Sequence, residues 1–155
     1  MDSIPDYDFI APQKIVFGWG RRSEVGKLGR MLGLRAFLVS GLPEELVNKI
    51  VNEICDTLRK ESVEVVHAAN ILREPEVEDV DRLAEQIRRE KPANGDLMIA
   101  IGGGAAIDLA KAAGAMATND QSPTVKDFLE NVGRDLKIVS PPLPVLAMPT
   151  TAGTG

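Results

Sequence analysis

Short apolar runs with strand character recur along this chain, and helical patterns separate them. The runs are KIVFG at 14–18, AFLVS at 36–40, VEVVH at 63–67, LMIAI at 97–101 and PVLAM at 144–148. Strands that alternate with helices usually form a parallel sheet whose faces the helices cover. The alternation therefore predicts an α/β fold with a mostly parallel sheet flanked by helices.

The clearest helical pattern lies between the second and third runs. It predicts a helix over 43–60, because apolar residues fall four apart there and form one stripe: Leu46, Ile50, Ile54 and Leu58. Pro43 suits the first turn of this helix. Cys55 lies among these apolar positions, so we expect it to be a core residue and not a nucleophile.

Two further helices and one turn are predicted. A helix from Glu76 to Lys91 ends ahead of a proline and turns four apolar residues inward, namely Val77, Val80, Leu83 and Ile87. A helix over 23–32 is less favoured because it contains Gly26 and Gly29, although small residues there allow close packing. The polar, proline-rich stretch 119–142 is read as an excursion with a helical turn near 127–130.

Length and charge exclude several classes of protein. The chain has 155 residues, enough for one domain. Its formal net charge of -5 argues against binding to nucleic acid or to an anionic membrane surface, since both need a basic face. No apolar run is long enough to span a bilayer, and the acidic start MDSIPDYDF is unlike a signal peptide. We therefore expect a cytoplasmic protein.

Three consecutive glycines follow the most apolar run. Gly102, Gly103 and Gly104 would lie where a buried strand meets the next helix, and ligands of open α/β sheets bind at such ends. Glycines let phosphate oxygens approach the backbone, and the helix N–H groups would face them. Ile107, however, breaks both the G-x-G-x-x-G and the P-loop patterns. Spacing alone leaves a diphosphate cradle and a plain tight turn equally open.

Two neighbouring features bear on that choice. Asp108 and Lys111 are spaced as an i, i+3 pair, which often only supports a helix surface. The final run continues into PTTAGTG, where Thr150, Thr151 and Thr154 could donate hydrogen bonds to a ribose, amide or phosphate. Thr151 or Thr154 could also cap a helix, which is compatible with that role. A second hydroxyl-rich loop at the same sheet edge favours the cradle.

Four motifs in order carry a resemblance that covers essentially the whole chain. They are FGWG at 17–20, GGGAAIDLAKAAGAMATN at 102–119, FLENVG at 128–133 and PTTAGTG at 149–155. Together they resemble the iron-containing (group III) alcohol dehydrogenases, which share a superfamily with glycerol dehydrogenase and dehydroquinate synthase.

The resemblance implies that residues 1–155 form a Rossmann-like NAD(P)-binding domain. Gly102–Gly104 would then hold the diphosphate, and Thr150, Thr151 and Thr154 would lie along the nicotinamide. In the family, a helical second domain supplies an Asp and three His that hold Fe²⁺ or Zn²⁺, and this chain has a single histidine, His67. We read His67 as a partly exposed strand-end residue, and expect no catalytic or metal-binding residue here.

The implied reaction is hydride transfer that interconverts small alcohols with aldehydes or ketones. The metal would polarise the substrate oxygen in the full-length protein, so we expect this chain alone to bind the cofactor weakly and to be inactive. A buried strand followed by a bare Gly-Thr loop is an unusual domain end, which predicts that the natural chain continues. Relatives pair through their N-terminal regions, which suggests a homo-oligomer in which KIVFG crosses between subunits.

Two departures from the family pattern concern the cofactor. Ala105 stands where the family usually has Ser, which removes one hydroxyl from the diphosphate site but leaves the backbone donors. Ser40 is followed by Gly41, where NAD-preferring relatives have Asp. A carboxylate there accepts from the ribose 2′-OH and repels a 2′-phosphate, so its absence favours NADP over NAD.

Two other functions stay open on the sequence. A lyase of the dehydroquinate-synthase type shares the cofactor-binding fold, although PTTAGTG and ATN favour the dehydrogenase. A standalone nucleotide-binding module is the non-enzymatic alternative. The substrate cannot be read from this chain, because in the family its pocket lies largely against the second domain.

Overall fold

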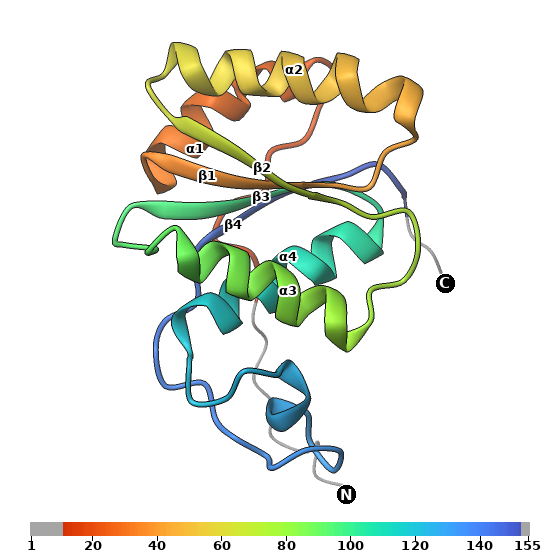
Figure 1. Cartoon of the computed structure of the whole chain (residues 1–155). Coiled ribbons are helices and arrows are strands. Elements are labelled where there is room, and N and C mark those ends of the chain that lie inside the picture. The colour runs from red at the N-terminus through yellow and green to blue at the C-terminus, as the bar shows by residue number, and fades with distance from the viewer. Residues whose placement is uncertain (1–10, 153–155) are drawn as a thin grey trace, which may run out of the picture.

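A computed structural model describes residues 11–152, which form four parallel strands between helices (Figure 1). The strands lie in the order β2-β1-β3-β4. Their bounds are β1 (Arg35–Ser40), β2 (Glu64–Asn70), β3 (Asp96–Gly102) and β4 (Val145–Pro149). The predicted α/β fold with a mostly parallel sheet is thus confirmed.

Helices cover both faces of the sheet. α1 (Val25–Leu32) and α2 (Glu44–Lys60) lie on one face, and α3 (Val77–Arg89) and α4 (Gly104–Thr118) lie on the other (Figure 1). Short 3₁₀ turns, η1 (Arg21–Glu24) and η2 (Val125–Phe128), complete the elements in the described part of the chain. β3 is buried along its whole length, because neighbouring strands pair with both of its edges and helices cover both of its faces.

The two faces of the sheet carry two apolar clusters. Leu38, Ile54 and Leu58 belong to the cluster under α1 and α2, and Phe37, Leu83 and Ile87 belong to the one under α3 and α4. The helix predicted over 43–60 is confirmed as α2, with Pro43 as its N-cap. Its stripe is buried in the C-terminal half of the helix, whereas Leu46, at the N-terminal end, is 43% exposed.

Glycines allow α1 to pack closely against α2. A Cβ atom on Gly26 would lie 2.2 Å from the carbonyl oxygen of Thr57, and one on Gly29 would lie 2.7 Å from Cδ2 of Leu58. These contacts confirm the close packing expected from the small residues. Each glycine costs about 1 kcal/mol of helix stability relative to alanine, but the neighbouring atoms of α2 leave no room for an unstrained alanine there.

A bidentate ion pair joins the central strands at their amino ends. Arg35 Nη2 lies 2.6 Å from Oδ2 of Asp96, and its Nε donates to Oδ1 over 3.1 Å. The two residues are partners in the β1–β3 register, and Asp96 is buried. The Asp96 carboxylate also accepts the backbone N–H of Ala93 over 2.9 Å, so each of its oxygens has a partner.

Two predictions about strands are wrong. Residues 14–18 form no strand, and Ile15 and Phe17 are 76% and 92% exposed, because no strand in the described part of the chain lies alongside them. β2 continues to Asn70, so His67 lies within the strand instead of at its end, and its side chain is exposed.

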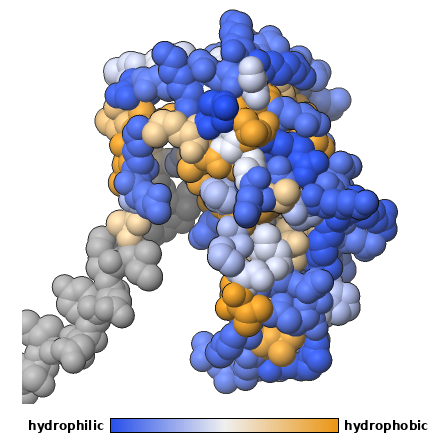
Figure 2. Space-filling model, turned by 90° about the vertical axis from the view of Figure 1, so that its left-hand side faces the viewer, coloured by the Kyte–Doolittle hydropathy of each residue, from blue (hydrophilic) through white to orange (hydrophobic). Residues whose placement is uncertain are grey.

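Figure 2 shows a mainly hydrophilic surface that is interrupted by hydrophobic patches.

The stretch between α4 and β4 is ordered by one buried amide. Oδ1 of Asn119 accepts the backbone N–H groups of Val139 and Ser140, each over 2.9 Å, and its Nδ2 donates to the Ser140 carbonyl over 3.0 Å. Asn119 therefore joins the two ends of the excursion. The turn within it, η2, begins two residues before the predicted start at Asp127.

Candidate functional site

Three loops meet where the carboxyl ends of β1, β3 and β4 lie side by side. The backbone N–H of Gly41 donates to the carbonyl oxygen of Ile101 over 2.7 Å, and that of Thr150 donates to Gly102 over 2.9 Å. The loop after β3 is thus joined by hydrogen bonds to the loops after both neighbouring strands. The structure therefore brings together the predicted positions on the glycine run, at Gly41 and on the threonine loop.

Gly41 and Gly102 are in direct backbone contact. A Cβ atom on Gly102 would lie 2.9 Å from the Cα of Gly41, and Gly102 also has a φ of 151°, which side chains disfavour. A Cβ atom on Gly41 would lie 2.9 Å from the Cβ of Ala106. Packing between β1 and the start of α4 accounts for both glycines.

Gly104 has a different environment. A Cβ atom there would meet no atom of the described residues within 4 Å, and Gly104 does not have a positive φ. Internal packing therefore does not require a glycine at the first residue of α4. A phosphate group close to the backbone would require one, because a side chain would occupy the space of the phosphate.

The first turn of α4 offers backbone donors at the same place. Gly103 is the N-cap, and no side chain in residues 11–152 caps this helix. The first intrahelical bond reaches from the N–H of Ile107 to the Gly103 carbonyl over 3.3 Å, which leaves the N–H groups of the preceding turn to an external acceptor. Ala105, in place of the hydroxyl residue usual in the family, is half-buried in this turn. These donors and the space at Gly104 fit a diphosphate.

The threonine loop lies next to the glycine run. A Cβ atom on Gly103 would lie 3.6 Å from Cγ2 and 3.8 Å from Oγ1 of Thr151, and both Thr150 and Thr151 are exposed. Thr154 lies outside the described residues. Two of the three predicted threonines thus border the turn that opens α4.

Ser40 and Asp108 have other partners. The hydroxyl of Ser40 is buried, donates to Oδ1 of Asn70 over 2.8 Å and lies 3.2 Å from Nε2 of His67. Asp108 is exposed on α4 and pairs with Lys111 at 3.7 Å, which matches the surface-pair reading of this spacing. Ser40 therefore links β1 to β2, and Asp108 lies one turn beyond the glycine run.

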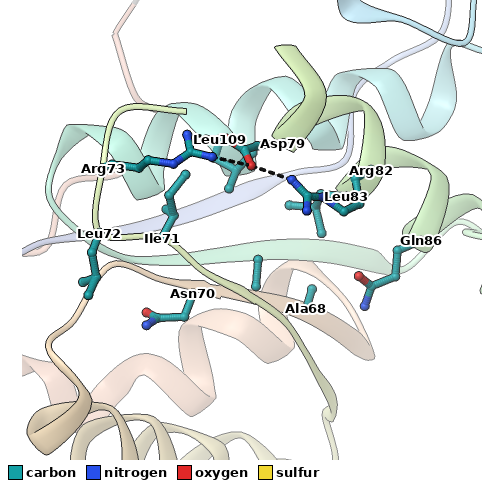
Figure 3. A pocket seen from close by; sticks show the side chains of 11 residues that line it. Ala68, Asn70, Ile71, Leu72, Arg73, Asp79, Arg82, Leu83, Gln86 and Leu109 are labelled. Carbon is teal, nitrogen blue, oxygen red and sulfur yellow. Dashed lines mark hydrogen bonds and ion pairs between the residues drawn. The ribbon is translucent and has the colours of Figure 1, made fainter. Parts of the chain in front are cut away.

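A cavity of about 300 Å³ lies between β2 and α3 (Figure 3). Its lining includes Ile71, Arg73, Asp79, Arg82 and Leu109. The Asp79 carboxylate pairs with both arginines, with shortest distances of 2.7 Å to each. A hydrogen bond from the Glu76 backbone and another from Arg73 lower the pKa of Asp79.

Sequence reasoning did not identify this cavity or its arginines. Arg73 follows a strand whose length was underestimated, so its place at the sheet edge was not evident. The signal that could have located it is the NILREPE segment at 70–76, where a basic residue stands between the strand and the next helix.

Metal-binding and nucleophilic groups complete the description. Across residues 11–152, no group of three or more His, Cys, Asp or Glu side chains is placed to hold a metal ion. Cys55 is a buried core residue, as predicted, and its burial raises the pKa of the thiol. No helix in the described part of the chain is long and apolar enough to cross a membrane.

This chain is similar in sequence and fold to known proteins. The family described as iron-containing alcohol dehydrogenase matches residues 12–155. The long-chain-alcohol dehydrogenase 1 of Geobacillus thermodenitrificans is 34% identical over 139 residues, which cover 89% of this chain and 33% of that enzyme.

Solved structures agree with the sequence relatives. An archaeal halo-thermophilic Red Sea brine pool alcohol dehydrogenase has a TM-score of 0.83 and 27% identity, over 98% of this chain and 38% of its own. The sulfoacetaldehyde reductase of Bifidobacterium kashiwanohense, solved with NAD⁺, has a TM-score of 0.69 and 28% identity, over 97% of this chain and 37% of its own. This chain spans about a third of the length of the curated relatives it matches.

Proposed function

Because the chain belongs to the iron-containing alcohol dehydrogenase family, we propose that it is the NAD(P)-binding domain of an alcohol dehydrogenase. The whole enzyme would interconvert small alcohols with aldehydes or ketones by hydride transfer. The single observation that carries the binding role is the space at Gly104 beside the backbone donors that open α4. Packing within the described chain gives no reason for that glycine, whereas a bound diphosphate does.

Each part of the site has a proposed task. The backbone N–H groups of Gly104, Ala105 and Ala106 would donate to the diphosphate, and the positive end of the α4 dipole would favour its charge. Thr150, Thr151 and Thr154 would donate to the nicotinamide half, with Thr151 already beside Gly103. The cofactor, when bound, supplies or accepts the hydride.

We propose a preference for NADP over NAD. A carboxylate after β1 would accept from the ribose 2′-OH and repel a 2′-phosphate, and this chain has Gly41 there. The contact between Gly41 and Ala106 would crowd any side chain at residue 41, so a carboxylate has little room there. The sulfoacetaldehyde reductase was solved in complex with NAD⁺. We propose that this chain binds NAD less tightly than it binds NADP.

The metal-dependent step is proposed to need residues other than those described. Within the described residues, neither His67 nor Cys55 belongs to a group of three or more side chains that could hold a metal ion, so these residues do not fit an Fe²⁺ or Zn²⁺ site. We propose that the helical domain of the family supplies it. A cytoplasmic location and assembly of several copies stay predictions.

Titration of the 155-residue chain with NADPH and with NADH tests the proposal. We expect saturable binding of NADPH, measured by the change in its nicotinamide fluorescence, and weaker binding of NADH. We expect no reduction of NADP⁺ by simple alcohols when Fe²⁺ or Zn²⁺ is added. If neither NADPH nor NADH binds, the binding role is contradicted. Metal-dependent turnover by this chain contradicts the assignment of the chemistry to another domain.

A further inference from the structure

The loop that follows β2 lies against Gly41. The backbone N–H of Ile71 donates to the Ser40 carbonyl over 2.8 Å, and the N–H of Leu42 donates to Oδ1 of Asn70 over 3.4 Å. A Cβ atom on Gly41 would lie 3.1 Å from the carbonyl oxygen of Ile71. Residues 70–73 therefore continue the same edge of the sheet on which the glycine and threonine loops lie.

Arg73 is the cation of this loop. It is the second residue after Ile71, and it lines the cavity with Leu109 of α4 (Figure 3). Its side chain is 54% exposed, and its Nη1 donates to the Glu74 carbonyl over 2.9 Å. Arg73 therefore belongs to the loop that contacts Gly41, and its guanidinium group lies on the face of the sheet that α3 and α4 cover.

Arg73 shares its main ion-pair partner with other donors. Its main partner, Asp79, also pairs with Arg82 at 2.7 Å and accepts the backbone N–H of Glu76 over 2.9 Å. Asp79 therefore keeps a cation and a backbone donor when Arg73 turns away. The remaining acidic contact of Arg73, with Glu76, is long at 3.7 Å and exposed, and such pairs contribute little.

We propose that Arg73 selects NADP by pairing with its 2′-phosphate, an inference that rests on the proposed function. The diphosphate at α4 would place the adenosine ribose near Gly41, where no carboxylate opposes a phosphate. Arg73, in the adjoining loop, then supplies a positive charge that pairs with this phosphate. Guanidinium groups bind phosphates through two parallel hydrogen bonds, so one arginine suffices for this selection.

Two nucleotides that differ only in the 2′-phosphate test this role. The 155-residue chain is titrated calorimetrically with 2′,5′-ADP and with 5′-AMP, at low and at moderate salt. We expect tighter binding of 2′,5′-ADP, and Arg73→Ala should weaken it about tenfold or more, because loss of even one of the two charge-assisted hydrogen bonds has that effect. Binding of 5′-AMP should change less than about twofold, since the variant keeps every contact of the shared part.

Arg82→Ala is the matched control, because it removes the other arginine that pairs with Asp79 and lines the same cavity. It should leave the affinity for 5′-AMP unchanged and lower that for 2′,5′-ADP by less than Arg73→Ala does, because Asp79 then holds Arg73 more firmly but the guanidinium group remains. Arg73→Lys should recover part of the selectivity. Thermal unfolding of each variant reports whether the fold is retained.

The outcomes separate the two proposals. Equal binding of the two nucleotides by the unaltered chain, or equal losses with Arg73→Ala and Arg82→Ala, overturns the role of Arg73 and leaves the binding role standing. Lack of binding of both nucleotides overturns the binding role, and the Arg73 inference falls with it.

Discussion

The backbone N–H of Thr150 donates to the carbonyl oxygen of Gly102 over 2.9 Å, so the glycine and threonine loops are joined through main-chain atoms. Side-chain changes on these loops can therefore alter ligand contacts without removing the hydrogen bond that holds the loops together.

Gly104→Ala is expected to weaken cofactor binding while the fold keeps its stability. The added Cβ atom has no protein neighbour within 4 Å in the described chain, and alanine favours a helix by about 1 kcal/mol over glycine. The methyl group would occupy the space proposed for the diphosphate, so we expect at least a tenfold loss of NADPH affinity, on the order of 1.4 kcal/mol. Fluorescence titration and thermal unfolding of the same sample measure the two effects. Unchanged affinity would argue against a diphosphate at this helix.

Gly41→Asp is expected to shift selectivity from NADP toward NAD and to destabilise the fold. The carboxylate would repel a 2′-phosphate, while the Cβ atom would crowd Ala106 at 2.9 Å. Crowding of this kind costs about 1–3 kcal/mol of unfolding free energy. The ratio of NADP to NAD affinity and a urea unfolding curve report the two changes.

Two companion variants separate those effects. Gly41→Ala should show the same destabilisation with little change in selectivity, because it adds the Cβ atom without the charge. Adding Ala106→Gly to Gly41→Asp should restore part of the stability, since it removes the methyl group that the new side chain meets. If Gly41→Ala shifts selectivity as strongly as Gly41→Asp, charge is not the cause.

Gly26→Ala is expected to destabilise the chain by about 1–3 kcal/mol through overpacking. Its Cβ atom would lie 2.2 Å from a backbone oxygen of α2, at Thr57, so the two helices would have to separate. Gly29→Ala is the matched control, because its Cβ atom would meet the end of the Leu58 side chain, which can rotate. Urea unfolding should show the larger loss for Gly26→Ala, and the reverse order would contradict this packing argument.

Low pH is expected to loosen the stretch between α4 and β4. Hydrogen bonds from Arg134 and Ser122 lower the pKa of Asp127. A carboxyl group with a lowered pKa in the folded state stabilises the fold above its ordinary pKa, and this stabilisation is lost as pH falls through the lowered value. The protection of residues 120–136 against hydrogen exchange, corrected for the intrinsic pH dependence of exchange, should therefore fall in that acidic range. In Asp127→Asn the exchange should already be fast at neutral pH, with a weaker dependence on pH.

The sequence predicted the elements that periodicity defines well. α2, α3 and the buried strand β3 were predicted because their apolar spacing reflects burial on one face or on both faces. KIVFG shows the limit of such patterns: Ile15 and Phe17 have strand character, yet local sequence does not specify whether another strand lies beside them.

The candidate site was predicted in part, for a similar reason. Glycine and threonine patterns mark the loops at Gly102 and Thr150, and parallel strands bring these loops to one edge. Arg73 could not be predicted, because its place depends on where β2 ends, at Asn70, and on its pairing with Asp79, nine residues after that end. Charge pairs between a loop and the next helix leave no periodic pattern in the sequence.

The ion pair between Arg35 and Asp96 lies at the amino ends of the same strands whose carboxyl ends form the candidate site. Six residue steps along the strand lead from Arg35 to Gly41, about 20 Å at the usual rise of a strand. The buried ion pair and the residues proposed to bind the cofactor thus lie at opposite ends of the sheet. Breaking this ion pair should therefore lower the free energy of unfolding without touching the residues proposed to bind the cofactor.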